Sequence, residues 1–217
     1  MKYKNIMFDL DGTLQDSADG LFAVLFLTLQ RMGLPADFDY DTMRKMSGPP
    51  IVHSLEHLFH VPADRIDEAM ALFLEVAAET RLEDKLNHAF RGVDAMLARL
   101  RESGRRLHVV TAKPAERARH QLAWVGLAPY IDELIGPEDD YHADKAAQLN
   151  ALFDSGRARR EESVMVGDRL YDAEAARAAG VAFIGVLYGC GSEEELRAAG
   201  AACFAETVPD LEKLLLG

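Results

Sequence analysis

The chain of 217 residues is 49% hydrophobic and 28% charged, a composition that suits one packed core with a sizeable insertion and argues against long disorder. Its 36 acidic residues outnumber its 24 lysines and arginines, and the net charge of −12 excludes nucleic acid and anionic membranes as expected partners, because both repel a negative surface. With only Cys190 and Cys203, and no signal-peptide or membrane-spanning run, we expect a cytoplasmic protein.

Four apolar runs predict buried strands, at residues 5–9, 106–111, 163–168 and 182–188, and a weaker strand is expected at 133–135. Each of the four runs stops at a polar residue or a glycine. The helical patterns between them end at Gly104, Gly126 and Gly180. Strands that alternate with helices in this way predict an α/β fold with a doubly wound, Rossmann-like parallel sheet.

Residues 16–88 interrupt the alternation, because they hold helical patterns but no convincing strand. The predicted helices are 18–32, 40–46, 51–60 and 64–81. Since this insertion leaves the sheet just after the first strand, it should lie over the carboxyl edge and act as a lid. The expected domains are therefore a core of residues 1–15 and 89–217 and a helical cap of residues 16–88.

Polar side chains gather where the predicted strands end. Two carboxylates one residue apart on a buried strand end repel each other unless a cation or hydrogen bonds offset them. Further acids, a hydroxyl and an ammonium follow at later strand ends, so that the set comprises Asp9, Asp11, Thr111, Lys145, Asp168 and Asp172. Hard oxygen ligands suit Mg²⁺, and the hydroxyl and ammonium suit a phosphoryl group.

The order and type of these motifs resemble those of the haloacid dehalogenase superfamily, in the branch with a helical cap inserted after the first motif. The chain is most similar to phosphoglycolate phosphatase-like enzymes. The matching motifs span nearly the whole chain and are Asp9-Leu10-Asp11-Gly12-Thr13, Thr111-Ala112-Lys113-Pro114, Lys145 and Gly167-Asp168-Arg169-Leu170-Tyr171-Asp172. The later motifs are weak singly, whereas together they are specific.

The resemblance implies that Asp9 attacks phosphorus and becomes an aspartyl-phosphate, and that Asp11 protonates the leaving alcohol and later takes a proton from water. It implies a Mg²⁺ ion held by Asp9, the backbone carbonyl of Asp11 and Asp168, with Asp172 beside them and its direct ligation left open. Thr111 and Lys145 are expected to hold the phosphoryl group. Substrate contacts are expected from Gly12, Thr13, Ala112, Lys113 and, in the cap, Arg44.

The sequence thus favours a Mg²⁺-dependent phosphomonoesterase acting on a small phosphorylated metabolite, either phosphoglycolate or a nucleoside 5′-monophosphate. A phosphomutase similar to β-phosphoglucomutase shares the same core and stays open. A dehalogenase is disfavoured, because carbon–halogen cleavage needs no acid such as Asp11. A non-enzymatic receiver module is disfavoured, because receivers are about half this length and carry their aspartate after a middle strand. Both a monomer and a homodimer fit the sequence.

Two features of the predicted cap, a basic pair and a histidine string, each allow a second interpretation. Arg44 and Lys45, before Gly48-Pro49-Pro50, could meet an anionic substrate tail or form a solvated basic patch. The histidines of the string His53-Ser54-Leu55-Glu56-His57 resemble a zinc motif, but their spacing places them opposite the apolar side of a helix. We therefore interpret them as the exposed face of a cap helix.

Overall fold

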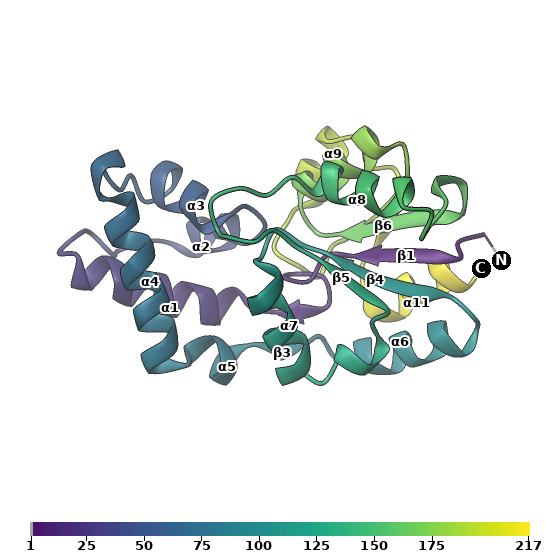
Figure 1. Ribbon diagram of the computed structural model, residues 1–217, viewed down its shortest axis with the longest axis horizontal. Coiled ribbons are helices and arrows are strands. Elements are labelled where there is room, and N and C mark those ends of the chain that lie inside the picture. Colours follow the sequence, from purple (N-terminus) through teal and green to yellow (C-terminus); the bar gives the residue numbers. More distant parts are fainter. Residues whose placement is uncertain (1) are drawn as a thin grey trace.

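The protein is built on a single six-stranded sheet with a helical cap at one end (Figure 1). Its computed structural model describes residues 2–217. The sheet order is β5-β4-β1-β6-β7-β8, and every pairing is parallel. Its strands are β1 (Asn5–Phe8), β4 (Arg106–Val110), β5 (Glu133–Ile135), β6 (Ser163–Gly167), β7 (Ala182–Val186) and β8 (Phe204–Ala205). The predicted doubly wound α/β fold is confirmed; β8, only two residues long, was not predicted.

Helices cover both faces of this sheet (Figure 1). One apolar cluster joins Ile6 and Phe8 to helices on one face, and a second joins Met7 to helices on the other face. The first face holds α6 (Val93–Glu102), α7 (Ala115–Trp124) and α11 (Val208–Leu216), and the second holds α8 (Lys145–Asp154) and α9 (Leu170–Ala179). Because β1 is buried on both sides, its residues 6–8 form a continuous apolar run and do not alternate.

Shorter elements complete the core. They are α10 (Glu193–Ala198) and the 3-10 turns η2 (Ala128–Tyr130) and η3 (Arg160–Glu162). Among residues 2–217, the helices lack the combination of length and apolar character that crossing a bilayer requires.

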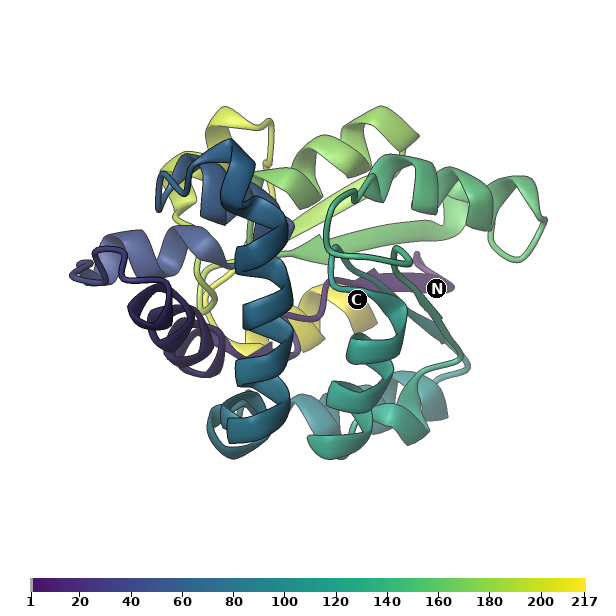
Figure 2. The same cartoon turned by 60° about the vertical axis from the view of Figure 1, so that its left-hand side comes forward.

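The cap has its own apolar cluster, which includes Val24, Leu25, Leu55 and Phe73. Its elements are α1 (Ala18–Arg31), α2 (Tyr40–Met46), α3 (Ile51–His57), η1 (Ala63–Arg65), α4 (Ile66–Thr80) and α5 (Leu82–Leu86). They follow the predicted helical ranges closely, although α5 was not predicted. Figure 2, in which the cap comes forward, shows α4 standing in front of the core.

A short antiparallel ribbon marks the two places where the chain passes between core and cap. It pairs β2 (Gln15–Asp16) with β3 (His88–Ala89). Strands of two residues leave no periodic signal in a sequence, so this ribbon was not predicted. It brings the start and the end of the cap together.

The register of the sheet places the strand ends side by side. Phe8 is level with Val109 of β4 and with Val166 of β6. The residues that follow these positions therefore emerge at one edge, beneath the cap. This edge is where the sequence motifs predict the chemistry.

His108 is a buried polar residue of β4. It is 1% exposed, neither ring nitrogen has a hydrogen-bond partner, and its Nδ1 lies 3.8 Å from the nearest carboxylate oxygen, on Glu133. Burial, reinforced by the charge of Arg106, lowers the pKa of His108 to about 4. The folded protein therefore holds this imidazole in its neutral form.

We expect the free energy of unfolding to fall as the pH drops from about 6.5 towards 4, by at most about 3 kcal/mol from this group. The reason is that His108 takes up a proton in the unfolded chain at a pH where the folded ring remains neutral. Urea unfolding across this pH range measures the slope, and His108→Leu should flatten it. The exposed His142→Gln is the control; an unchanged slope in His108→Leu would contradict the assignment.

Candidate active site

The loop after β1 turns sharply so that it runs against the end of β6. Gly12 has a φ of +80°, and a Cβ atom at this position would lie 2.2 Å from a carboxylate oxygen of Asp168. Glycine is therefore required both by the backbone conformation and by the close approach. The hydroxyl of Thr13 donates to Asp168 at 3.4 Å, so the two predicted loop residues lie beside the acid of the later motif.

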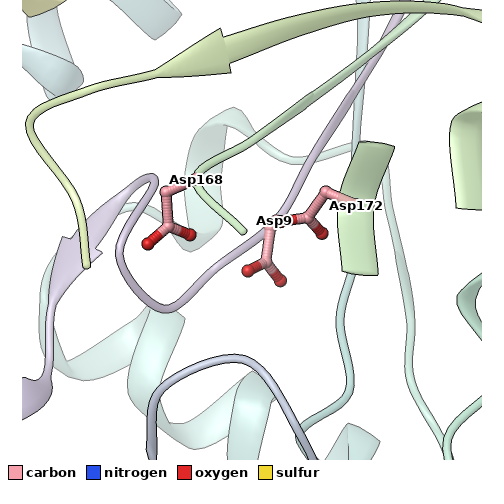
Figure 3. A group of neighbouring side chains, drawn as sticks. All are labelled: Asp9, Asp168 and Asp172. Carbon is pink, nitrogen blue, oxygen red and sulfur yellow. The ribbon is translucent and has the colours of Figure 1, made fainter. Parts of the chain in front are cut away.

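Three buried carboxylates converge at this edge of the sheet. One oxygen from each of Asp9, Asp168 and Asp172 lies within 4.8 Å of the others, and none of the three residues is more than 1% exposed. Figure 3 shows that they come from three separate places: the end of β1, the end of β6 and the first turn of α9. The structure thus brings together acids that are up to 163 residues apart in the sequence (172 − 9).

The electrostatics of this three-acid cluster are unfavourable without a cation. Burial raises the pKa of Asp9 well above its usual range, and the neighbouring acids add to the effect against the opposing charge of Lys145. Burial and the charge of Asp172 likewise raise the pKa of Asp168 to about 7. Both shifts report the cost of placing negative charges together away from water.

Lys145 supplies the positive charge within the cluster. Its Nζ lies 2.8 Å from Asp9 Oδ1 and 2.6 Å from Asp172 Oδ1. It stands at the start of α8, whose first turn is capped by the side chain of Asp144. Burial alone would lower the pKa of Lys145, but Asp172 and Asp9 raise it overall, so the ammonium is retained.

A divalent cation fits the remaining charge. Three carboxylates face one ammonium, and Asp9 Oδ2 is buried without a hydrogen-bond partner. Of the other acids, Asp168 accepts a hydrogen bond from the backbone N–H of Cys190 at 2.7 Å, and Asp172 accepts one from that of Arg169 at 3.1 Å. These bonds hold the carboxylates in place and leave ligand atoms available.

Asp11 belongs to a different part of the site. Its carboxylate accepts from Gln15 Nε2 at 2.8 Å and from Lys113 Nζ at 3.0 Å, and it is not a member of the three-acid cluster. Burial acts to raise the pKa of Asp11, yet the charge of Lys113 and hydrogen bonds from Ser17, Gln15 and Lys113 lower it overall. The side chain lines the cavity beside Lys113. Its role in proton transfer and the metal contact of its backbone carbonyl both stay predictions.

Thr111 and its neighbours form one wall of a cavity above Asp9. The hydroxyl oxygen of Thr111 accepts from the backbone N–H of Lys113 at 3.1 Å. Residues 111–113, Asp9 and Asp11 line the cavity on the core side. Its volume is about 30 Å³, room for roughly one or two water molecules, so the cap leaves little space above Asp9.

The cap supplies the opposite wall. This wall is largely apolar and comes from α1 and from the segment between α2 and α3: Leu21, Met46, Ser47, Gly48, Pro49, Pro50 and Ile51. The cap histidines lie elsewhere: His53 and His57 are exposed with ring centroids 4.5 Å apart, in agreement with the predicted outer face.

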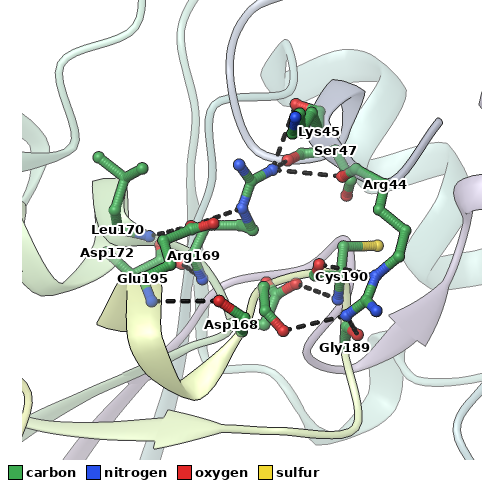
Figure 4. A network of polar contacts seen from close by, with 12 residues as sticks. Arg44, Lys45, Ser47, Asp168, Arg169, Leu170, Asp172, Gly189, Cys190 and Glu195 are labelled. Atoms are coloured by element: carbon green, nitrogen blue, oxygen red, sulfur yellow. Dashed lines mark hydrogen bonds and ion pairs between the residues drawn. The ribbon is translucent and has the colours of Figure 1, made fainter. Parts of the chain in front are cut away.

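The predicted substrate contact of Arg44 stays a prediction, and the structure does not place this side chain in the cavity wall. Its guanidinium donates instead to backbone carbonyls of the loop after β7, at 2.9 Å to Cys190, 3.1 Å to Gly191 and 3.3 Å to Gly189 (Figure 4). Three carbonyl oxygens compete for the donors that a substrate anion would need. Lys45 is exposed, as expected for a solvated residue.

Arg169, to which the sequence analysis gave no role, makes the reciprocal contact from the core. Its guanidinium donates to the carbonyl of Ser47 and, at 3.3 Å, to that of Lys45, while Nε donates to Glu195 at 2.8 Å (Figure 4). It thereby satisfies carbonyl groups at the end of α2 that the helix leaves free. One sequence signal could have indicated this role. Arg169 is a cationic residue within an acidic motif, and that motif follows a strand end that faces the inserted cap.

A second contact between core and cap also escaped the sequence analysis. Arg117 of α7 donates to Asp140 at 2.9 Å and to Glu83 of α5 at 3.2 Å. Arg117 and Asp140 both line the cavity. In the sequence, Arg117 resembles the other charged residues of an amphipathic helix, so no local pattern indicates its contact with the cap.

Comparison with known proteins places these features in a family. Residues 6–186 match the haloacid dehalogenase-like hydrolases, and the chain belongs to that family. It is 34% identical over 199 residues to a 5′-nucleotidase from Pseudomonas aeruginosa, covering 91% of this chain and 89% of that protein. It is 31% identical to a phosphoglycolate phosphatase from Cupriavidus necator, covering 97% and 92%.

Solved structures of other proteins show the same fold. A crystal structure described as a predicted phosphatase from Clostridium acetobutylicum superposes with a TM-score of 0.90 at 29% identity, covering 100% of this chain and 99% of the other. The capped fold and the phosphatase relatives identify the protein as an enzyme of the phosphatase type, whose substrates are small phosphorylated compounds.

We expect Arg169→Met to loosen the contact between the cap and the core, because hydrogen bonds from a charged donor are worth about 1.5–3 kcal/mol. Hydrogen exchange of the backbone amides of α2 and the following turn should accelerate about tenfold or more. Exchange followed by mass spectrometry measures this. Arg177→Met, an exposed arginine on the same helix, is the control, and equal protection in the two variants would refute the role of Arg169.

Proposed function

We propose that the protein is a Mg²⁺-dependent phosphomonoester hydrolase that works through an aspartyl-phosphate on Asp9. One observation carries the proposal: Asp9 has one carboxylate oxygen on Lys145 and the other without a partner, at the floor of a cavity that Thr111 and Asp11 also line. A nucleophile, a cation and a proton-transfer group thus surround one small space.

The metal belongs to the three-acid cluster in this proposal. Asp9 and Asp168 would hold the ion, together with the backbone carbonyl of Asp11, and Asp172 would lie beside them. A bound Mg²⁺ supplies positive charge that allows one anion to attack another. Asp172 has a second task, since it orients Lys145 through the contact of 2.6 Å.

The protein groups carry out two displacements. A carboxylate oxygen of Asp9 forms a bond to phosphorus while the bond from phosphorus to the leaving alcohol breaks, and Asp11 gives its proton to that alcohol. Asp11 then takes a proton from the water that attacks the aspartyl-phosphate and restores Asp9. The hydroxyl of Thr111 and the ammonium of Lys145 hold the phosphoryl oxygens.

The resting state favours Asp11 as a base, because Lys113 helps to lower its pKa. A phosphate dianion near this pair competes for the charge of Lys113 and raises the pKa of Asp11. Substrate binding therefore brings Asp11 towards the protonated form that the first displacement needs. In the second displacement the ionised form is the useful one.

The activities of the two similar proteins suggest two candidate substrates, phosphoglycolate and a nucleoside 5′-monophosphate. A phosphomutase with the same core would differ in its product, because it returns an isomerised phosphosugar and releases no phosphate. Phosphate release from a panel of phosphorylated metabolites distinguishes the two reactions.

Asp9→Asn should abolish phosphate release, with a loss of about 10⁴-fold or more, because the amide cannot attack phosphorus. Folding should be retained, since the substitution removes a charge from a crowded acidic cluster. Colorimetric phosphate release and thermal unfolding measure the two effects. Asp154→Asn, which removes an exposed charge, is the control, and turnover by Asp9→Asn near the wild-type rate would remove Asp9 from the nucleophile role.

Chelation of Mg²⁺ should stop turnover, and Ca²⁺ should restore less than about a tenth of the rate that Mg²⁺ restores, because its larger and looser ligand shell disturbs the in-line geometry. A thermal shift on adding each ion reports binding independently of catalysis. Full activity in the presence of a chelator would contradict the metal site.

A further inference from the structure

The cavity above Asp9 contains two cationic side chains, and carboxylates already neutralise both. Lys113 Nζ lies 3.0 Å from Asp11 Oδ1 and 3.6 Å from Glu83 Oε1. Arg117 lies 2.9 Å from Asp140 and 3.2 Å from Glu83. Two cations thus face three acids, which leaves this group with a net charge of −1 (2 − 3).

These ion pairs are held inside the protein. Glu83 is 8% exposed and Asp140 is 7% exposed, and the ring of Phe73 in α4 lies 5.1 Å from the guanidinium carbon of Arg117. Removing one partner from such a pair would leave a buried charge without compensation. An anion that entered the cavity would therefore have to displace a carboxylate from Arg117 or remain beside a negative group.

The rest of the cap wall offers an anion no charged group. It consists of Leu21, Ser47 with its hydroxyl, the apolar residues around Gly48 and the two prolines. Arg44 is engaged by three carbonyl oxygens and Lys45 is exposed. Among the cavity-lining residues of the described chain, each cation is thus paired with an acid.

Building on the proposed phosphatase function, we propose that the cavity selects phosphomonoesters whose leaving alcohol is uncharged and partly apolar, and that Glu83 and Asp140 determine this specificity. The two acids occupy the donors of Arg117 and keep the local charge negative. An uncharged nucleoside satisfies this requirement. Leaving groups that carry a carboxylate or a second phosphate do not.

The test uses a pair of substrates that differ in one group. Phosphoglycolate carries a carboxylate where 2-hydroxyethyl phosphate carries an uncharged hydroxymethyl group, and the two are otherwise alike. The wild-type enzyme with Mg²⁺ should favour 2-hydroxyethyl phosphate by about tenfold or more in kcat/KM, since a like charge within the cavity is poorly screened. Where turnover is slow, the ratio of the two inhibition constants against p-nitrophenyl phosphate measures the same preference at the level of binding.

Two variants release Arg117 while preserving shape. Asp140→Asn and Glu83→Gln each remove one negative charge and keep an oxygen acceptor, so either one tests the proposal if the other fails to fold. Each should reduce the preference for the uncharged substrate about tenfold, mainly by improving phosphoglycolate. Glu138→Gln removes an exposed charge from the same loop as Asp140 and should leave the ratio unchanged.

The outcomes separate this inference from the function on which it rests. One outcome is that p-nitrophenyl phosphate is hydrolysed and that phosphoglycolate and 2-hydroxyethyl phosphate have equal kcat/KM. The proposed selection for uncharged leaving alcohols is then overturned, and the phosphatase proposal stands. The same conclusion follows if Asp140→Asn and Glu83→Gln both fold and neither changes the ratio of kcat/KM between the two substrates. If no phosphomonoester is hydrolysed at all, the proposed function fails and the inference fails with it.

Discussion

The repulsion among Asp9, Asp168 and Asp172 is the constraint around which the rest of the site is arranged. Buried carboxylates at such short range cannot all be ionised unless positive charge is fixed among them. Lys145 meets part of this demand, and its contacts of 2.8 and 2.6 Å tie the start of α8 to β1 and α9. The residual negative charge makes the cluster receptive to a divalent cation. The stability of this edge and its chemistry therefore have the same electrostatic origin.

Two arginines join the cap to that edge, one from the core and one from the cap. Arg169 reaches from the core to the end of α2, and Arg44 reaches from α2 to the loop that holds Cys190. Because the N–H of Cys190 donates to Asp168, the loop contacted by the cap is also the loop that orients a candidate metal ligand. Closure of the cap and orientation of the acidic cluster are thus linked through one short segment.

The sequence predicted the sheet and the polar residues at its edge because both leave local signals. Buried strands are continuous apolar runs, and Asp9, Thr111 and Asp168 follow them directly. Parallel strands bring such positions together whatever their separation along the chain. The cap helices were also predictable from their helical patterns. Gly33 follows the end of α1 and Asp39 caps the start of α2, whereas α3 and α4 end without a glycine.

The contacts between cap and core could not be predicted in the same way. Arg44 looked suited to a substrate anion, but whether a guanidinium meets a ligand or a backbone carbonyl depends on how two separately folded units meet. Arg117 and Asp140 are distant in sequence from each other and from Glu83, and each alone resembles a surface charge. Their role emerges only when three elements approach one another.

The β2–β3 ribbon has a consequence for how such an enzyme can diversify. Because the chain enters and leaves the cap at neighbouring positions, and because the cap has an apolar cluster of its own, the insertion resembles a module grafted onto the sheet. Its interior can accept new side chains without disturbing the strand ends that hold the carboxylates. Selection for a new metabolite can therefore act on one half of the molecule while the phosphorus chemistry is inherited unchanged in the other.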